Sequence, residues 1–296
     1  MILNVSGRTD IVAFYSEWFM NRYREGFVDV RNPFNKKLVN RIYFEDVDMI
    51  VFCTKNPLPI IPYLKEINKP VLFQITLTGY FGDIEPNVID KNKIIDGIKQ
   101  ISNIIGSENV NVRYDPIFLS EKYDTSYHVR ALKKITDLLD GYISKVIISF
   151  LDEYKNVKKN HKYLNYKKIN YEDYRELGIS FSKMAKEKNI SIHTCFEEKT
   201  LEEFGLNKDD CVSHSLVFKM TGKTGFKTWS ARGNGNCHCV SMVDIGVYNT
   251  CKHFCRYCYA NYDEKNVIEN MKKHNPTSSL LIGELEKDDV IKIRRS

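Results

Sequence analysis

The sequence predicts an α/β fold, a TIM-like (β/α) barrel that is either full or partial, and three observations lead to this prediction. Short apolar runs rich in β-branched residues recur along the chain, segments of helical period separate them, and polar residues gather where the runs end. Unbroken apolar runs are typical of parallel strands that are covered on both faces. In a β/α barrel the carboxyl ends of these strands form one rim, and the active site lies there.

The elements follow one another in the order that a parallel α/β fold requires. Strands are predicted at Ile2–Val5, Met49–Phe52, Val71–Thr76, Val110–Tyr114, Val146–Phe150 and Ile190–Thr194. Helices are predicted where apolar residues share one face, at 14–23, 94–105, Val129–Leu139 and Tyr174–Lys186. The polar segments after the strands are SGRTD (6–10), TKNP (54–57), QITLTG (74–79), RYDP (113–116) and HTCFEE (193–198).

Length, charge and cysteine content narrow the class of protein. The 296 residues carry a net charge of +6, which fits a nucleotide, an RNA surface or simple solubility and selects none of them. We find no signal peptide and no apolar stretch long enough to span a membrane, and therefore expect a cytoplasmic protein. Thiols stay reduced in that compartment, so the eight cysteines are expected to bind metal rather than to form disulfides.

One domain is expected over residues 1–296, because no interdomain linker is evident. It would comprise a barrel body at about 1–200, a cysteine-rich metal and cluster region at about 195–262, and a C-terminal extension at 263–296. The basic, aromatic segment 152–168 interrupts the alternation of strands and helices. It is interpreted either as a solvated loop or as a lid over an anionic substrate.

A cysteine motif late in the chain is the strongest functional signal. The stretch CKHFCRYCYAN, residues 251–261, places Cys251, Cys255 and Cys258 at C-x3-C-x2-C spacing, with Tyr257 before the last cysteine. Three thiolates could form most of a zinc site. A short loop of this kind can also bind three corners of a [4Fe–4S] cluster and leave the fourth iron open, which suits a reactive site.

The motif resembles the C-x3-C-x-aromatic-C signature of the radical S-adenosylmethionine (SAM) superfamily. The resemblance implies a [4Fe–4S] cluster on the three cysteines, with the open iron chelating the amino and carboxylate groups of SAM. It also implies that the reduced cluster cleaves SAM to a 5′-deoxyadenosyl radical, which removes a hydrogen atom from the substrate. Superfamily members usually have this loop after the first strand, whereas here it follows six predicted strands.

The late position is similar to that in a bacterial radical-SAM-like family, long catalogued as of unknown function, with its cysteine cluster at the C-terminus. The segments that support the resemblance are SGRTDI, YSEWFMNR, VRNPFN, TKNP, RYDPI, DIGVYNTC and CRYCYAN. One branch of that family is a queuine lyase, which releases queuine from queuosine 5′-phosphate in queuosine salvage. By analogy we expect hydrogen abstraction from a ribose carbon and cleavage of the glycosidic bond. The family usually has an aromatic residue at Cys53, so this cysteine is expected in the core.

Such a substrate suggests roles for the polar residues at the strand ends. Carboxylates would pair with the N–H donors and the amine of a 7-deazaguanine, and the candidates for this catalytic group are Asp10, Asp115 and Glu197. Cations would bind the 5′-phosphate, and the candidates are Arg8, Lys55 and Arg113. Contacts with SAM or the cluster are expected from Asn56, Gln74, Arg113 and Tyr257.

A second candidate metal site is formed by Cys195, Cys211, Cys237 and Cys239. Four thiolates complete either a structural zinc site or an auxiliary iron–sulfur cluster, and the spacing does not decide between them. The alternative is that these are ordinary buried thiols.

The expected partners are a small nucleotide or nucleoside and an electron donor such as flavodoxin or ferredoxin, without a membrane and without stable nucleic-acid binding. One alternative is a radical SAM enzyme that modifies or repairs intact nucleic acid, similar to the spore photoproduct lyases, which would bind DNA or tRNA with strong salt dependence. Another is a non-enzymatic zinc or iron–sulfur protein, which would not cleave SAM.

Overall fold

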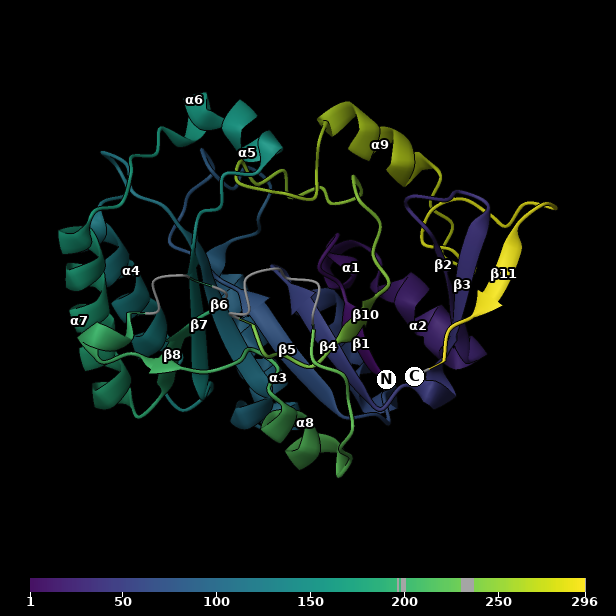
Figure 1. The fold of residues 1–296 in the computed structure, drawn as a ribbon, viewed down its shortest axis with the longest axis horizontal. Coiled ribbons are helices and arrows are strands. Elements are labelled where there is room, and N and C mark those ends of the chain that lie inside the picture. Colours follow the sequence, from purple (N-terminus) through teal and green to yellow (C-terminus); the bar gives the residue numbers. More distant parts are fainter. Residues whose placement is uncertain (196, 198–200, 230–236, 296) are drawn as a thin grey trace.

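The chain forms an open parallel sheet of eight strands with a smaller sheet beside it (Figure 1). The structure is a computed structural model that describes residues 1–296 except 196, 198–200, 230–236 and 296. The strand order is β10-β1-β4-β5-β6-β7-β8-β9, and all neighbours are parallel. The strands are β1 (Ile2–Val5), β4 (Met49–Thr54), β5 (Val71–Thr76), β6 (Val110–Ile117), β7 (Lys145–Phe150), β8 (Ser191–Thr194), β9 (Asn207–Lys208) and β10 (Met242–Asp244).

The prediction of an α/β fold with parallel strands is confirmed, but the prediction of a TIM-like barrel is wrong. In the described part of the chain the sheet ends at β9 on one side and at β10 on the other, and these two strands do not pair. After β8 the chain adds strands of only 2 and 3 residues, β9 and β10. The described residues between β9 and β10, among them Val212, Val217 and Val240, pack on one face of the sheet, and a closed barrel would need further strands to join its two edges.

Helices cover one face of the large sheet, which we call the outer face. They are α1 (Ile11–Phe14), α2 (Ser16–Glu25), α3 (Lys91–Ile105), α4 (Thr125–Leu138) and α7 (Tyr171–Lys188). Side chains of Asp90, Asp124 and Asn170 cap the first turns of α3, α4 and α7, which explains where these helices begin. Outward-facing strand residues such as Phe73 and Val112 join the apolar faces of the helices in the main core.

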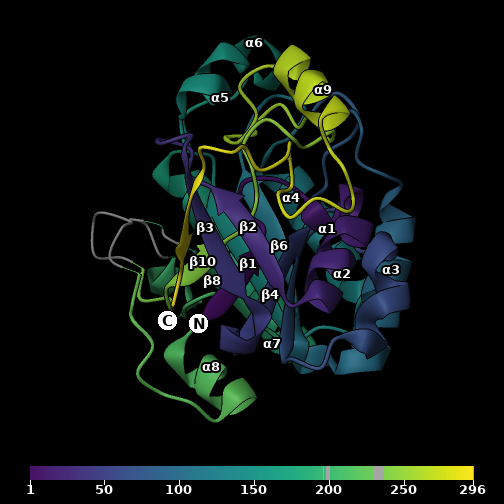
Figure 2. The ribbon, with the colours of Figure 1, turned by 90° about the vertical axis from the view of Figure 1, so that its right-hand side faces the viewer.

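The opposite, inner face is covered by described residues of the chain that follows β8. Val212, Val217 and Val240 of this segment pack against Ile2 and Leu72 in a second core. Helix α8 (His214–Thr221) belongs to it and lies across the sheet from α3 (Figure 2). Toward the carboxyl ends of the strands the inner face turns polar, with Asn4, Cys53, Gln74, Arg113 and Ser149. The apolar half of the face therefore holds the covering segment, and the polar half is left to line a cavity.

The other elements lie around this sheet. A three-stranded sheet contains β2 (Phe27–Arg31), β3 (Leu38–Tyr43) and β11 (Val290–Ile293), with β2 antiparallel and β11 parallel to β3. Helices α5 (Lys155–Lys159), α6 (His161–Leu164) and α9 (Glu264–Lys272) lie beyond the carboxyl ends of the large sheet (Figures 1 and 2). Short 3-10 helices lie at Phe44–Asp46, Leu58–Glu66, Ser107–Asn109 and Glu202–Phe204. Within the described ranges, no helix combines the length and apolarity that a membrane crossing requires.

Candidate functional site

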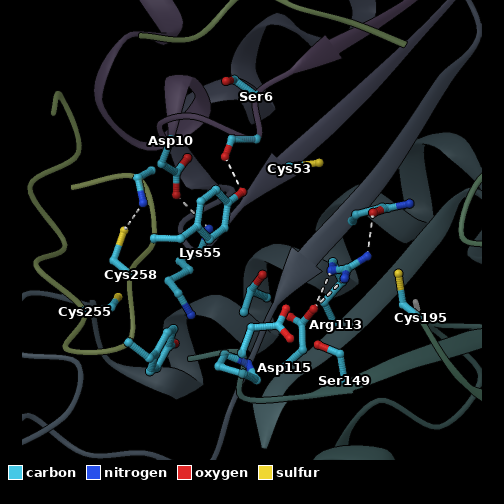
Figure 3. Close-up of a pocket in the computed structure, with 18 of the residues that line it drawn as sticks. Ser6, Asp10, Cys53, Lys55, Arg113, Asp115, Ser149, Cys195, Cys255 and Cys258 are labelled. Carbon is cyan, nitrogen blue, oxygen red and sulfur yellow. Dashed lines mark hydrogen bonds and ion pairs between the residues drawn. The ribbon is translucent and has the colours of Figure 1, made fainter. Parts of the chain in front are cut away.

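A cavity of about 640 Å³ lies at the carboxyl ends of the parallel strands, on the inner face of the sheet (Figure 3). Residues from all five polar segments predicted from the sequence line it. The predicted site residues that line it are Asp10, Lys55, Gln74, Arg113, Asp115, Glu197, Tyr257 and the seven cysteines of the two sets. A cavity of this size can hold a ligand as large as a nucleotide.

The cluster loop, residues 249–261, reaches this cavity because β10 pairs with β1. Val243 lies opposite Leu3 in that parallel pair, so the chain after β10 continues beside the segment that follows the first strand. The thiols of Cys251, Cys255 and Cys258 all line the cavity. Cys255 and Cys258 lie at one end of the view in Figure 3, and Cys195 of the second set lies at the other.

Side chains hold the backbone of the cluster loop, and most of them are asparagine amides. Six side chains each donate a hydrogen bond to one backbone carbonyl of the loop. They are Asn270 (to the carbonyl of Asn249, 3.0 Å), Tyr15 (to Thr250, 2.6 Å), Asn261 (to Cys251, 2.7 Å), Asn87 (to Lys252, 2.8 Å), Asn160 (to Arg256, 2.7 Å) and Asn156 (to Cys258, 2.7 Å). These bonds satisfy the loop carbonyls without any ligand, so the loop keeps its shape with the thiols toward the cavity. Asn156 and Asn160 belong to the basic segment 152–168, which therefore supports the loop.

The surroundings of the three thiols fit a cationic metal group. Burial raises the pKa of Cys255 to about 12, although Lys55 opposes this. Burial also raises the pKa of Cys251 well above its ordinary value, and the nearby Asp10, Cys258 and Cys255 raise it further. Such thiols ionise when a metal compensates the charge, so the three cysteines fit as ligands of an iron–sulfur cluster. The Ala260 N–H donates to Cys258 Sγ at 3.3 Å, which is the kind of bond that stabilises a bound thiolate.

Glu85 is the centre of a buried charge network beside the loop. The residue is 2% exposed and accepts hydrogen bonds from Lys55 Nζ at 2.9 Å and Thr78 Oγ1 at 2.9 Å. It also pairs with Lys91 and accepts from the Tyr257 hydroxyl. Burial disfavours the charged carboxylate, but the two ammonium groups outweigh burial and lower the pKa of Glu85 to about 2. The network fixes both Lys55 and Tyr257 at the cavity wall.

Asp10 connects the end of the first strand to the cluster loop. Its Oδ2 atom accepts from Nε2 of His253 at 2.9 Å and from the Lys55 N–H at 2.7 Å. Its Oδ1 atom accepts from the Ala13 N–H at 2.9 Å and caps α1. Asp10 and His253 are both buried. The carboxylate therefore positions the loop, and its predicted catalytic role stays a prediction.

Arg113 and Asp115 lie two residues apart on β6, so both side chains point into the cavity. Arg113 Nε donates to Asp115 Oδ2 at 2.9 Å, and Arg113 Nη1 donates to Gln74 Oε1 at 3.1 Å. Gln74 Nε2 donates in turn to the carbonyl of Cys211 at 3.2 Å. The Arg113 and Asp115 side chains are 19% and 14% exposed, so a ligand in the cavity can reach this ion pair.

Glu197 is a carboxyl group whose proton affinity suits acid–base chemistry. Its Oε1 atom accepts from the Phe150 N–H at 2.7 Å. Burial raises the pKa of Glu197 to about 8, assisted by nearby Asp152, Cys195 and Asp115 and opposed by the Phe150 hydrogen bond. The carboxyl group is therefore mostly protonated at neutral pH and can give a proton to a ligand in the cavity.

Arg8 and Asn56, both predicted to bind ligands, do not line the cavity. Arg8 Nε pairs with Asp244 Oδ1 at 3.0 Å, and Asn56 Oδ1 accepts from the Leu58 N–H at 3.2 Å in a turn. Asp244 also accepts from Ser6 Oγ at 2.8 Å, which ties the end of β10 to the end of β1. In this structure Arg8 and Asn56 thus shape the loops around the cavity.

Cys53 was expected in the core, and it packs, partly buried, against the second core while also lining the cavity. Its Sγ atom donates to Asn4 Oδ1 at 3.3 Å. Among the residues that the structure describes, no three or more His, Cys, Asp or Glu side chains form a preassembled metal-binding group. At either cysteine set, the side chains would have to turn toward a metal when it binds.

Three organising residues of the site were not predicted: Glu85, His253 and Asp244. Asp244 lies within DIGVYNTC, a segment that supports the family resemblance, and His253 lies within the cysteine motif CKHFCRYCYAN, so both residues were already within the singled-out segments. Glu85 lies in a loop without periodic pattern or motif, and its role appears only when Lys55, Lys91 and Tyr257 are brought together.

Fold and site together define a class: an α/β protein whose open parallel sheet bears a cysteine-lined cavity at the carboxyl ends of its strands. The chain belongs to the family described as Domain of unknown function (DUF1848), which matches residues 2–260. The match includes every predicted site residue and both cysteine sets. It confirms the expectation of a family catalogued as of unknown function. A search of curated proteins found no match to the chain.

Proposed function

We propose that the protein is a radical-SAM-type enzyme that binds a [4Fe–4S] cluster through Cys251, Cys255 and Cys258 and acts on a nucleotide-type substrate. The observation that supports this most is that three thiols of one short loop line the same cavity as the polar ends of the central strands. When bound, the cluster and SAM would supply the electron and the radical that remove a hydrogen atom from the substrate. An electron donor such as flavodoxin or ferredoxin would be needed.

The residues around the loop would prepare it for this role. Its carbonyls accept hydrogen bonds from side chains, so the protein's own groups position the loop backbone. The Tyr257 side chain is buried between the loop and Glu85 and would keep water from one side of the cluster. The Lys55 ammonium faces the cavity near Cys255 and would favour the anionic ligand set or a carboxylate of SAM.

The proposed substrate is an anionic nucleotide, and on the family resemblance it is queuosine 5′-phosphate, which would make the protein a queuine lyase. Arg113 and Lys55 would bind the phosphate, since both are cations that line the cavity. Asp115 would accept N–H bonds from the base, and the protonated Glu197 would exchange a proton with the base as it leaves. These roles follow from charge and position at the cavity wall.

Anaerobic reconstitution with iron and sulfide tests the first part of the proposal. We expect an EPR signal of the reduced cluster that changes when SAM is added, and formation of 5′-deoxyadenosine. Cys258→Ser should lose both, whereas Cys53→Ser, which alters another thiol of the same cavity wall, should keep both. A protein that holds only zinc at the loop, or that never cleaves SAM, would be the non-enzymatic alternative.

Product analysis with queuosine 5′-phosphate tests the second part. We expect free queuine to accumulate in a reaction that requires SAM, reductant and the intact loop. If 5′-deoxyadenosine forms without free base, the lyase assignment is wrong while the radical SAM assignment stands.

A nucleic-acid substrate is the second candidate, and one observation favours it. The segment beside the loop exposes Lys155, Lys158, Lys159, Lys162, Lys167 and Lys168. Nucleic-acid binding through these lysines would weaken steeply with salt. Replacing Lys155, Lys159 and Lys162 by Gln should then abolish binding of tRNA or DNA, but should leave turnover of a small nucleotide unchanged.

A further inference from the structure

The end of the cavity away from the cluster loop contains a second group of thiols that the proposed function does not use. Cys195 follows β8, Cys211 precedes α8, and Cys237 and Cys239 follow that helix. All four are free and line the cavity. Cys195, Cys211 and Cys239 are buried, with exposed fractions of 9%, 6% and 6%. Four buried or half-buried thiols gathered from three parts of the chain need an explanation.

The side chains share one buried region. Cys195, Cys211 and Cys239 lie in the same buried cluster, and Cys237 packs against it. The backbone keeps this arrangement, because the Val240 N–H donates to the Val212 carbonyl at 2.9 Å and so joins the residues next to Cys239 and Cys211. These contacts place three of the four side chains in one cluster.

The neighbouring groups suit a negatively charged tetrathiolate site. Arg113 Nη1 donates to Cys211 Sγ at 3.6 Å, and Gln74 Nε2 donates to the Cys211 carbonyl at 3.2 Å. Four thiolates around one divalent ion carry two net negative charges, and the guanidinium would compensate part of that charge. Arg113 also donates to Asp115, so one guanidinium contacts both the second cysteine set and the carboxylate of the cavity wall.

We propose that Cys195, Cys211, Cys237 and Cys239 bind one structural Zn²⁺ ion. With Zn–S bonds of about 2.3 Å, tetrahedral ligands lie about 3.8 Å apart, so side chains that already share one buried cluster need only turn toward a single ion. A four-iron cube would hold its cysteine sulfurs farther apart and would need room among them. The ion would fasten the segment after β8 to the inner face of the sheet, where Val212, Val217 and Val240 also pack. This proposal does not rest on the proposed function, because it uses different cysteines.

Metal analysis of the full-length protein and of two variants separates the two sites. We expect about one zinc per chain in protein purified in air, retained after anaerobic reconstitution with iron. The double variant Cys211→Ser/Cys239→Ser should lose the zinc and still bind iron at the cluster loop. The triple variant Cys251→Ser/Cys255→Ser/Cys258→Ser should lose the iron and keep the zinc. Zinc that disappears with the cluster-loop variant would overturn the proposal.

A measurement on the unaltered protein covers the case in which the first variant does not fold. X-ray absorption at the zinc edge should show four sulfur neighbours at about 2.3 Å. Wild-type protein without zinc, a zinc site with nitrogen or oxygen ligands, or a second iron–sulfur cluster in its place would each overturn the proposal. None of these results would bear on SAM cleavage at the other cysteines.

Discussion

Replacing Glu85 by Gln should destabilise the protein strongly at neutral pH. The side chain is 1% exposed and pairs with two cations, Lys55 and Lys91, whose side chains are 13% and 31% exposed. A pKa lowered from 4.5 to about 2 corresponds to about 3 kcal/mol of folding free energy. A second, independent estimate agrees with this, because removing one partner of a buried ion pair destabilises a protein by about 3–5 kcal/mol. We therefore expect Glu85→Gln to lower the free energy of unfolding by about 3 kcal/mol at pH 7.

Urea-induced unfolding, followed by circular dichroism of the metal-free protein, measures this difference. A carboxylate with a lowered pKa stabilises the fold above its ordinary pKa, so the wild-type advantage should be complete at pH 7 and should shrink as the pH falls from about 4.5 toward 2. Adding Lys55→Met to Glu85→Gln should recover part of the loss, because one of the two cations left without Glu85 is removed. The exposed Glu121→Gln is the control and should stay within about 0.5 kcal/mol of wild type. A loss below about 1 kcal/mol for Glu85→Gln at pH 7 would refute the reasoning.

Three further predictions concern other contacts of the site. Gly246→Ala should destabilise the protein by about 1–3 kcal/mol in urea unfolding, because the added Cβ would lie 1.9 Å from Ser6 Oγ. Gly82→Ala is the control and should be neutral, since no atom lies within 4 Å of its added Cβ. Equal effects of the two substitutions would contradict this prediction. Glu197→Gln should gain stability relative to wild type as the pH rises from about 5 to 8, by at most about 1.4 kcal/mol per pH unit. The reason is that the wild-type carboxyl group ionises in the unfolded chain above about pH 4.5 but stays protonated in the fold up to about pH 8; a parallel pH profile would disprove the raised pKa. Asn156→Ala should lower the free energy of unfolding by about 1–3 kcal/mol and lower the amount of iron retained after reconstitution, because the carbonyls of Cys258 and Asn261 lose their donor. The control Lys155→Ala should change neither quantity.

Local patterns were enough to find six of the eight strands of the large sheet and most of the helices on its outer face. The apolar runs at Ile2–Val5 and Val71–Thr76 are strands with these same bounds, and the Ile-rich face at 94–105 lies in α3. The short strands β9 and β10 were missed because segments of 2 and 3 residues have no periodicity. Closure of the sheet was wrongly predicted for the same reason, since it depends on what these edge strands pair with.

For the site, residue type and spacing predicted which side chains are chemically capable. The cluster-loop cysteines and the polar strand ends were found because C-x3-C-x2-C spacing and carboxyl-terminal strand positions are local features. The partners of these residues were not found. Arg8 has the charge to bind a phosphate, but the structure pairs it with Asp244, 236 residues away in the sequence.

The sequence alone thus determined the parallel α/β character of the chain, the family resemblance and the residue types available for chemistry, since all of these depend on near neighbours along the chain. Only the tertiary structure decided that the sheet stays open, that β10 brings the late cluster loop next to the first strand, and that Glu85 and Asp244 organise the charges around the cavity. The physical reason is that ion pairs and strand pairing act through space, between groups whose separation along the chain leaves no local pattern.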